Sequence, residues 1–465
     1  MTAAQHVEAL ISYASARGLL DPFDIRVARN KVLALLRIAE PFTGAPQLPE
    51  SPEAALAPIL DYAAQSGILA AGTIDNREKL AAEIMGIFTP PPSVIIPRFA
   101  ALAQQSPQAA TDWFHALSCD ANYVQTARIA KNLRWRTPSR YGELEITVNL
   151  SKPEKDPRDI ALATATPQSG YPKCLICAEN EGFAGDASRP ARQNLRLIPM
   201  ELAGETWYLQ YSPYAYYNEH CIVLSREHTS MQIKRATFCR MLDFIERMPH
   251  YFIGSNADLP IVGGSILMHD HYQGGRHAFP MESAALLDGY ERADLPGMRI
   301  SRLDWPLSVI RISCAAKQPL IDFADEITDT WRGYSDIASG VLAHTDAPHN
   351  TVTPIARVNS RGEFELDLAL RNNRTSAEHP MGIFHPHAEH HHVKKENIGL
   401  IEVMGLAVLP GRLAGELDAG RITRDEIGST FVRVLEDAGV FKQTPAGQAA
   451  FDRFMVSALR LTAAK

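Results

Sequence analysis

The first part of the chain has apolar residues at helical spacing. After a start at Asp21-Pro22, apolar side chains recur every three or four residues from Ile25 to Leu36, which predicts an amphipathic helix. Three successive prolines at 90–92 cannot continue a helix, so they mark a break. This pattern predicts a helical region over residues 1–130.

Strict alternation replaces the helical spacing near Tyr141. Leu144, Ile146 and Val148 alternate with polar residues, as expected of a half-buried strand. Residues 231–248 are amphipathic with helical spacing, and helical spacing returns after Leu413. Further strands are predicted at 206–210, 221–224, 260–267, 356–358 and 364–370, the last two joined by the hairpin signal at 359–362. The expected fold class is α+β.

Composition and charge narrow the class of protein. The 465 residues are 46% hydrophobic and 21% charged, typical of a globular protein with two or three structural units. A formal net charge of −7 without a basic stripe argues against nucleic-acid binding. No apolar run is long enough to span a membrane, and no signal peptide is evident. Six cysteines in so long a chain fit a reducing compartment, so we expect a cytoplasmic protein.

The segment His269-Asp270-His271-Tyr272-Gln273 is the strongest candidate for chemistry. On an extended backbone its two histidines share one face. Gly263, Gly264 and Ser265 precede it, and paired glycines let backbone N–H groups approach a phosphate closely. A histidine nucleophile, an amide and a glycine-lined cradle indicate chemistry at a nucleotide phosphate. The alternative is a buried strand with hydrogen-bonded histidines, which the flanking glycines disfavour.

Two groups of residues have the spacing of metal ligands. Cys174 and Cys177 form a C-x₂-C pair that can bind zinc, and His228 and His269 are placed to complete the tetrahedron. The alternatives are two unliganded core cysteines or a redox pair. A dense histidine tract includes His385, His387 and 390–392, which indicates either a second metal site or a solvated tract. For the nearby lysines 394 and 395 and for Glu402, a solvated surface position is an equal alternative to a role in a site.

The two histidine groups, near residues 269 and 385, each follow strand-like sequence. This repetition suggests a duplicated α+β unit. The expected organisation is therefore a helical region over 1–130, a first half over 131–300 that carries the nucleophile, and a second half over 301–465 with a helical C-terminal tail.

Several long blocks of sequence resemble the type 2 branch of the galactose-1-phosphate uridylyltransferases. These enzymes are also called UDP-glucose–hexose-1-phosphate uridylyltransferases. The resemblance covers residues 9–413, and its blocks are 144–157, 171–182, 210–220, 263–275 and 382–410. It implies a duplicated histidine-triad-like antiparallel sheet, with UDP-glucose and galactose 1-phosphate as substrates. A homodimer is a candidate assembly. The family also has a type 1 branch, which is only distantly similar. That branch has proline at the position of Asp270 and glycine at the position of Tyr272, so the sequence differs from it at both.

The resemblance also implies residue roles. The nucleophile falls on His271 and the phosphate-binding amide on Gln273, while Asn256 orients a phosphate and Glu402 contacts the hexose. The resemblance gives the same zinc ligands, Cys174, Cys177, His228 and His269, and it places a second divalent metal at His385 and His387. Further candidates for substrate binding are Gly263, Gly264, Ser265, the countercharges Arg276 and Lys152, and the tyrosines Tyr211 and Tyr214. A surface role for the two cations, and strand-end packing for the two tyrosines, are equal alternatives.

The expected mechanism is a ping-pong transfer. Neutral His271 attacks the α-phosphorus of UDP-glucose, glucose 1-phosphate leaves, and galactose 1-phosphate then takes the uridylyl group from the imidazole. Its other ring nitrogen is expected to donate to a backbone carbonyl or a carboxylate. Gln273 favours transfer over hydrolysis because an amide cannot shuttle a proton for water. The alternatives are a nucleotide-sugar phosphorylase or nucleotidyl hydrolase of the same superfamily, and a non-catalytic zinc-stabilised nucleotide-binding module.

Overall fold

The computed structural model describes residues 2–69, 73–151, 170–264 and 266–464. The candidates Lys152 and Ser265 lie outside the described residues. The chain forms two compact units. The first, which we call the N-terminal unit, comprises Met1–Lys131, Ser151–Met200 and Trp207–Ala215, and the second, the sheet unit, comprises Asn132–Leu150, Glu201–Thr206 and Tyr216–Lys465. The division at residues 130 and 300 stays a prediction.

Helices dominate the N-terminal unit, as predicted. Several begin where a side chain can cap them: Ser51, Thr73 and Ser106 each accept a hydrogen bond from an N–H of the first turn. The triple proline ends one helix and begins the next. The helices are α1 (Ala3–Ala16), α2 (Ile25–Leu35), α3 (Pro52–Gln65), α4 (Ile74–Phe88), α5 (Pro92–Gln105), α6 (Pro107–Asp120) and α7 (Thr126–Ile129). Within the described residues no single helix is long and apolar enough to cross a membrane, although α4 and α5, bent by 67°, pass that test together.

The predicted start of α2 at Asp21-Pro22 is wrong. The helix begins at Ile25 after Asp24, whose side chain makes no capping hydrogen bond. Asp21 Oδ1 instead accepts from Phe23 N at 2.9 Å. This local turn satisfies the backbone before the helix begins, because an aspartate side chain bonds readily to an N–H two residues on.

The strands form two sheets. A small sheet has the order β1-β2-β13, and a large one has the order β14-β8-β9-β10-β12-β11-β6-β7-β5-β4-β3. The pairings from β14 to β5 are antiparallel. This confirms the α+β class. The strands are β1 (Leu133–Ser139), β2 (Gly142–Val148), β3 (Ile198–Leu202), β4 (Glu205–Tyr211), β5 (Cys221–Ser225), β6 (Phe252–Gly254), β7 (His271–Gly275), β8 (Leu286–Glu291), β9 (Arg299–Leu303), β10 (Val309–Cys314), β11 (Asn350–Val358), β12 (Phe364–Asn372), β13 (Leu406–Leu409) and β14 (Thr462–Ala463).

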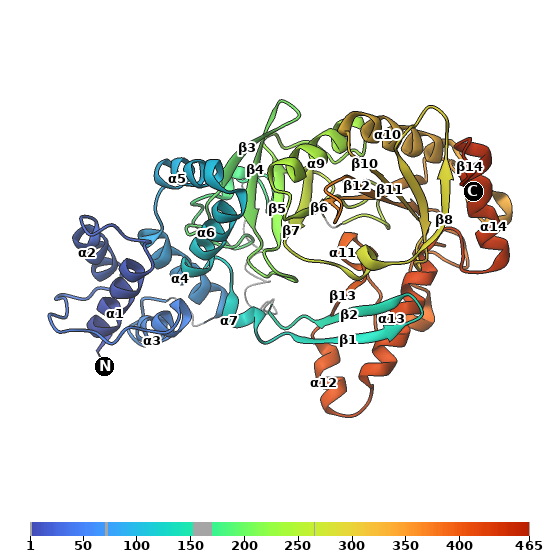
Figure 1. Cartoon of the computed structure of the whole chain (residues 1–465). Coiled ribbons are helices and arrows are strands. Elements are labelled where there is room, and N and C mark those ends of the chain that lie inside the picture. The colour runs from blue at the N-terminus through green and yellow to red at the C-terminus, as the bar shows by residue number, and fades with distance from the viewer. Residues whose placement is uncertain (1, 70–72, 152–169, 265, 465) are drawn as a thin grey trace. The chain divides into compact units, whose positions relative to one another are not determined.

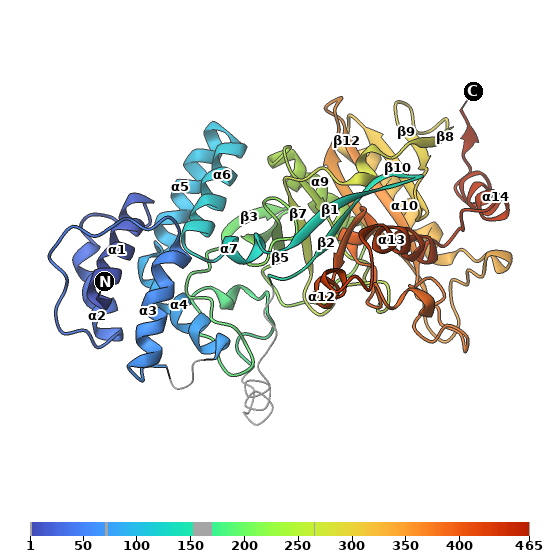
Figure 2. The ribbon, with the colours of Figure 1, turned by 90° about the horizontal axis from the view of Figure 1, so that it is seen from below.

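Helices cover this sheet unit. Two of them, α9 (Arg235–Arg247) and α10 (Lys317–Gly333), contact each other and β11, and Figure 1 shows them side by side along the sheet. Trp331 of α10 is fully buried and donates to Thr351 O at 2.9 Å. A third helix packs beside β1, as Figure 2 shows. It is α13 (Arg424–Ala438), and the remaining helices are α11 (Leu400–Val403), α12 (Arg412–Asp418) and α14 (Pro445–Arg453).

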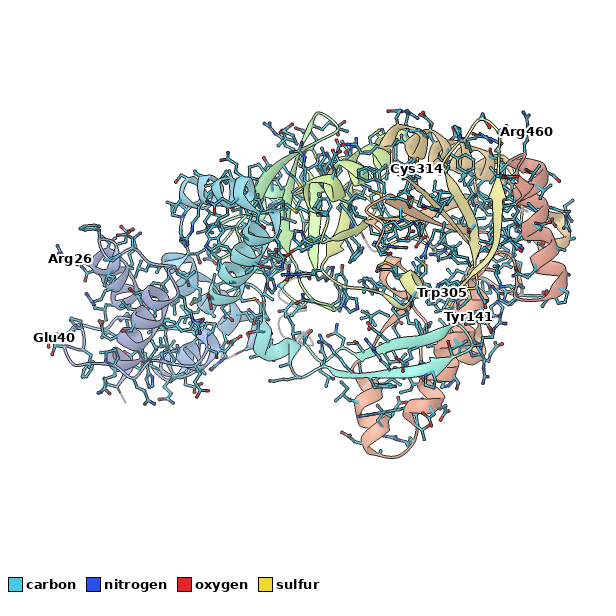
Figure 3. The ribbon with its side chains drawn as sticks, viewed as in Figure 1. Arg26, Glu40, Tyr141, Trp305, Cys314 and Arg460 are labelled. Carbon is cyan, nitrogen blue, oxygen red and sulfur yellow. The ribbon has the colours of Figure 1, made fainter. Side chains whose placement is uncertain are left out.

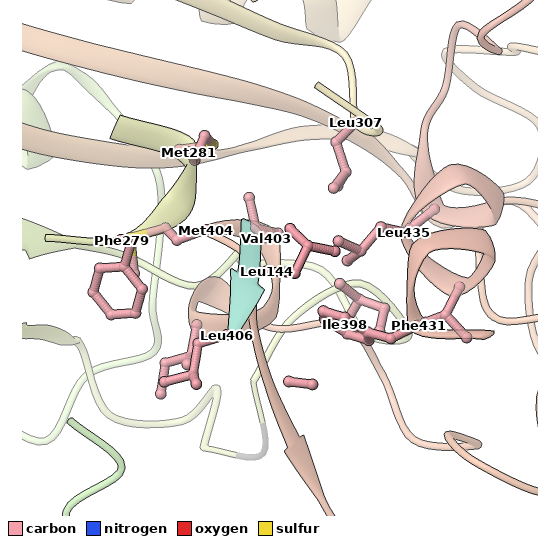
Figure 4. Packing of buried hydrophobic residues seen from close by; sticks show 14 of the residues in the cluster. Leu144, Phe279, Met281, Leu307, Ile398, Val403, Met404, Leu406, Phe431 and Leu435 are labelled. Atoms are coloured by element: carbon pink, nitrogen blue, oxygen red, sulfur yellow. The ribbon is translucent and has the colours of Figure 1, made fainter. Parts of the chain in front are cut away.

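The small sheet, α11 and α13 enclose a hydrophobic core (Figure 4). Leu144, Ile146 and Val148 are buried in it, which confirms the alternation read from the sequence. Trp305 is fully buried against this core and donates to Val403 O at 2.9 Å. Its ring lies 6.3 Å from that of Tyr141 (Figure 3). Burial of these large apolar side chains thereby fixes the small sheet to α11 and α13.

The strand predicted over residues 260–267 is wrong. The described part of this segment forms turns and an isolated bridge between Ala257 and Gly263, and the regular strand, β7, begins only at His271. Ile261 has a φ of 72°, which a strand does not allow. A Cβ at position 263 would lie 2.4 Å from Ala257 O, so the backbone approaches too closely for a regular strand with side chains.

We expect the buried carboxylate of Asp367 to be a main determinant of stability. It is fully buried and binds Arg311, with Nε at 2.7 Å, and Arg357. Replacing Asp367 by Asn leaves two buried guanidinium groups undercompensated, and should lower the free energy of unfolding by about 3–5 kcal/mol. The matched change Asp322→Asn breaks an exposed pair with Arg235 and should cost less than about 1 kcal/mol. Urea denaturation measures both, and similar small costs would contradict this expectation.

Candidate catalytic site

Strand β7 holds the two central candidates. It pairs with β5 on one edge, where His271 faces Leu224 and Gln273 faces Ile222, and with β6 on the other, where Gln273 faces Gly254. Residues two apart on a strand point to the same face. His271 and Gln273 therefore share one face of the sheet. The regular strand begins at His271, so His269 lies just before it, and a shared face for the two histidines stays a prediction.

The imidazole of His271 is held in one tautomer. Its Nδ1 lies 2.8 Å from His269 O, and since a carbonyl can only accept, Nδ1–H is the donor. The lone pair is then on Nε2. Burial lowers the pKa of His271 to about 4, so the ring is neutral at physiological pH. This confirms the expected hydrogen bond to a backbone carbonyl, and it leaves Nε2 unprotonated, as a nucleophile requires.

Gln273 has a partner that sequence reasoning missed. His220 Nε2 lies 3.0 Å from Gln273 Oε1, and the imidazole of His220 is buried. His220 immediately precedes β5, and only the register of β5 against β7 brings it to this face. No local pattern in the sequence predicts how β5 pairs with β7.

The glycine turn is tied to a later part of the chain. Asn256 Oδ1 accepts from Leu400 N at 2.9 Å, at the start of α11. A Cβ on Gly264 would lie 2.6 Å from Asn256 Nδ2, and one on Gly263 would lie against backbone oxygens. The structure therefore brings the candidates Asn256, Gly263 and Gly264 together. Only glycine leaves room for the backbone oxygens beside position 263 and for the Asn256 side chain beside position 264.

Glu402 and Lys394 form a buried pair. Lys394 Nζ lies 2.9 Å from Glu402 Oε1, and Glu402 Oε2 accepts from Gly399 N at 3.1 Å. Both residues are buried. A solvated surface position, one of the two interpretations from the sequence, is therefore wrong for both, whereas Lys395 is exposed. The role of Glu402 toward a hexose stays a prediction.

The remaining substrate candidates lie in varied surroundings. Arg276 Nε binds Glu219 Oε1 at 2.8 Å, so its charge is already compensated. Tyr211 is buried against the ring of Phe114, at 5.4 Å, and its hydroxyl donates to Thr111 O, which favours packing over contact with a base. Tyr214 lines a cavity of the N-terminal unit together with residues of α3 and α4.

The four predicted metal ligands lie close together. Cys174 Sγ and Cys177 Sγ are 3.4 Å apart, and the rings of His228 and His269 are 4.9 Å apart. One ligand atom from each of the four lies within 4.8 Å of the others. Two thiols and two imidazoles are a donor set that fits a tetrahedral metal ion.

Hydrogen bonds shape the surroundings of these ligands. Asn180 Nδ2 donates to Cys174 O and Cys177 O, both at 2.8 Å, and so holds the cysteine turn. His269 Nε2 donates to Ser225 O at 2.9 Å, which leaves Nδ1 for a metal.

Arg240 of α9 anchors the segment between the two histidines. Its Nη1 donates to Asp270 Oδ2 and to the hydroxyl of Tyr272, both at 3.3 Å. Sequence reasoning missed Arg240, because only the packing of α9 on the sheet brings it to this place.

His385 and His387 have other partners. His385 Nε2 lies 3.3 Å from Asn397 Oδ1, and His387 Nδ1 lies 3.3 Å from Asp437 Oδ1. The one cluster of three or more candidate ligands found among the described residues is that of Cys174. The second metal stays a prediction.

Comparison with known proteins gives a consistent family. Residues 21–230 match the model of the galactose-1-phosphate uridyl transferase N-terminal domain, and residues 244–423 match that of the C-terminal domain. The galactose-1-phosphate uridylyltransferase of Caldanaerobacter subterraneus subsp. tengcongensis is 46% identical over 98% of both chains, and that of Bacillus subtilis is 47% identical over 98% of both. A crystal structure of yeast Ap4A phosphorylase Apa2 is 10% identical, with a TM-score of 0.35, and covers 68% of this chain and 92% of that chain, a likeness too distant to bear on function.

The glycine turn should not tolerate a side chain. In Gly263→Ala the new Cβ would lie 2.4 Å from Ala257 O and 2.6 Å from Leu259 O, so the backbone must shift. We expect the affinity for UDP-glucose to fall about tenfold or more, which corresponds to about 1.4 kcal/mol. The control Gly333→Ala has open space around the new Cβ and should bind normally. Calorimetric titration measures both, and an unchanged Kd for Gly263→Ala would show that this turn does not bind the nucleotide.

Proposed function

We propose that this chain, which belongs to the galactose-1-phosphate uridylyltransferase family, transfers UMP from UDP-glucose to galactose 1-phosphate, giving glucose 1-phosphate and UDP-galactose. The observation that carries the proposal is the His271 imidazole, whose Nδ1 is committed to a backbone carbonyl while Nε2 is left as a nucleophile. The same activity is the one named for its near full-length relatives. It is the uridylyl-transfer step of galactose metabolism by the Leloir route.

The reaction has two half-reactions at one phosphorus. His271 Nε2 forms a bond to the α-phosphorus of UDP-glucose, and the bond between that phosphorus and the bridging oxygen breaks. Glucose 1-phosphate leaves with the electron pair. In the second half-reaction a phosphate oxygen of galactose 1-phosphate attacks the phosphorus, and the P–N bond breaks to return neutral His271. The imidazole is a good leaving group from the phosphoramidate, so the uridylyl group can pass on to the second sugar phosphate.

The other candidates act by position and by hydrogen bonding. Gln273, on the face of β7 that carries His271, donates to a non-bridging oxygen of the α-phosphate, and the Gly263-Gly264 turn and Asn256 hold the rest of the diphosphate. Phosphoryl-type transfer depends mainly on such positioning and electrostatic stabilisation. Because an amide cannot deliver a proton to or from water, the intermediate persists until a sugar phosphate arrives. This favours transfer over hydrolysis.

We assign the cluster of Cys174, Cys177, His228 and His269 to structural zinc. Its donor set offers four protein ligands, the number typical of a closed structural site. Bound zinc would hold the side chain of His269, and thereby the His269 carbonyl that orients His271. A reducing compartment, the cytoplasm, suits a chain whose six cysteines form no disulfide in the described structure.

The covalent step can be tested directly. We expect wild-type protein incubated with UDP-glucose alone to release glucose 1-phosphate stoichiometrically and to gain the mass of a uridylyl group at His271. In His271→Ala the rate of uridylyl transfer to galactose 1-phosphate should fall by about 10⁴-fold or more, because the nucleophile is lost. Intact-mass and peptide-mapping mass spectrometry locate the adduct.

The outcome also separates the alternatives. Continued release of UMP without acceptor would instead indicate a hydrolase, and dependence on inorganic phosphate would indicate a phosphorylase. Absence of any exchange of label between glucose 1-phosphate and UDP-glucose would indicate a non-catalytic nucleotide-binding protein.

Zinc and stability should be lost together. In Cys174→Ser we expect zinc to fall from about one ion per chain toward none, and the thermal midpoint to fall by several degrees, because binding energy at a structural site is folding energy. The control Cys239→Ser changes a half-buried cysteine of α9 outside the cluster and should keep its zinc. Elemental analysis by mass spectrometry with thermal unfolding measures both effects. Unchanged zinc in Cys174→Ser would remove this residue from the ligand set.

A further inference from the structure

We infer that His220 is a positioning residue, which fixes the amide of Gln273 so that its nitrogen, and not its oxygen, is presented to the phosphate. The inference rests on the proposed function, because it concerns how Gln273 binds the reacting group. His220 contacts the side-chain oxygen of Gln273 and is not expected to touch the phosphate, so it acts only through the Gln273 amide.

The register of the sheet brings the two side chains together. Ile222 faces Gln273, and His220 precedes Ile222 by two residues, so its side chain points to the same face. His220 Nε2 and Gln273 Oε1 are 3.0 Å apart, the distance of an ordinary hydrogen bond. His271 also lies on this face, two residues before Gln273 along β7.

Aromatic packing holds the imidazole of His220 in place. Its ring lies 4.5 Å from that of Tyr217 and 5.5 Å from that of Tyr216, and only 4% of the residue is exposed. The hydroxyl of Tyr217 donates to Gly274 O at 3.1 Å, next to Gln273 on β7. The imidazole is therefore fixed to the same strand as the amide that it contacts.

The direction of the hydrogen bond follows from the second nitrogen. His220 Nδ1 is buried and has no hydrogen-bond partner among the described residues. A buried N–H without an acceptor is rarer and more costly than a buried lone pair without a donor. Burial also lowers the pKa of His220 to about 4, so the ring carries a single proton. That proton is then on Nε2, His220 donates, and the carbonyl oxygen of Gln273 accepts.

A fixed oxygen also fixes the rest of the amide. The group is planar, so the N–H bonds of Gln273 point away from His220 and remain available to a non-bridging oxygen. Without His220 the amide can rotate by a half-turn and present a lone pair to an anion. That orientation opposes the charge that develops on the phosphate oxygens in the transition state. The effect therefore falls on the chemical step more than on ground-state binding.

Three substitutions at His220 test the inference through the rate of uridylyl-enzyme formation in single-turnover experiments with UDP-glucose. His220→Leu removes the donor and should slow adduct formation about tenfold or more at saturating UDP-glucose, with Kd changed less than about twofold. His220→Gln places an amide N–H near the former Nε2 and should restore most of the rate. His220→Asn is shorter, so it cannot reach Gln273 and should be as slow as the leucine variant.

A double-mutant cycle separates action through Gln273 from general damage. In the Gln273→Ala background, His220→Leu should slow the reaction by less than about twofold further, because the group on which it acts is gone. The matched control is His349→Leu. His349 Nδ1 also lies 2.8 Å from an amide oxygen, that of Asn373, but its partner is not on β7. This control should keep the wild-type rate.

Each outcome decides the inference. Wild-type rates in His220→Leu, or independent effects of His220→Leu and Gln273→Ala in the double variant, would overturn it while leaving the proposed function intact. If the leucine variant does not fold, the glutamine and asparagine variants still test the inference. Equal rates of adduct formation in these two variants would overturn it. Wild-type protein that forms no adduct would overturn both the proposed function and this inference.

Discussion

The position of β7 between β5 and β6 is the constraint on which the site depends. Main-chain hydrogen bonds on both edges fix the register, so that His271 faces Leu224 and Gln273 faces both Ile222 and Gly254. A slip by one residue would turn both side chains to the opposite face of the sheet. Backbone pairing therefore determines which side chains share the face of His271. A backbone carbonyl, that of His269, then orients the imidazole of His271.

Local patterns in the sequence predicted the features that depend on neighbouring residues. The alternation of Leu144, Ile146 and Val148 predicted a strand whose apolar face is buried, and the proline triplet predicted where α4 ends. The Cys174–Cys177 spacing predicted one half of the metal cluster. Such features follow from the period of a helix or a strand, or from the geometry of one turn, so a short stretch of sequence contains them. The specific roles proposed for the residues around His271 came mainly from resemblance.

Features that depend on distant pairing could not be predicted. The segment 260–267 has the apolar residues of a strand, yet close approach of two backbones at Gly263 makes it irregular. His220 and Arg240 meet the segment 269–273 only because β5 pairs with β7 and α9 packs on the sheet. The Lys394–Glu402 pair resembles exposed charges in the sequence, and its burial depends on how α11 folds against the core.

The hydrogen bond from Leu400 N to Asn256 has a mechanical consequence. The side chain of Leu400 also fills the space beside Gly254, where a Cβ would lie 2.7 Å from Leu400 Cδ1. One residue of α11 thus braces both the loop that carries Asn256 and the strand next to β7. Displacement of α11 would therefore move the loop that carries Asn256 and strand β6 together. A substitution at Leu400 would therefore disturb Gly254 and Asn256 together, although Leu400 is far from both in the sequence.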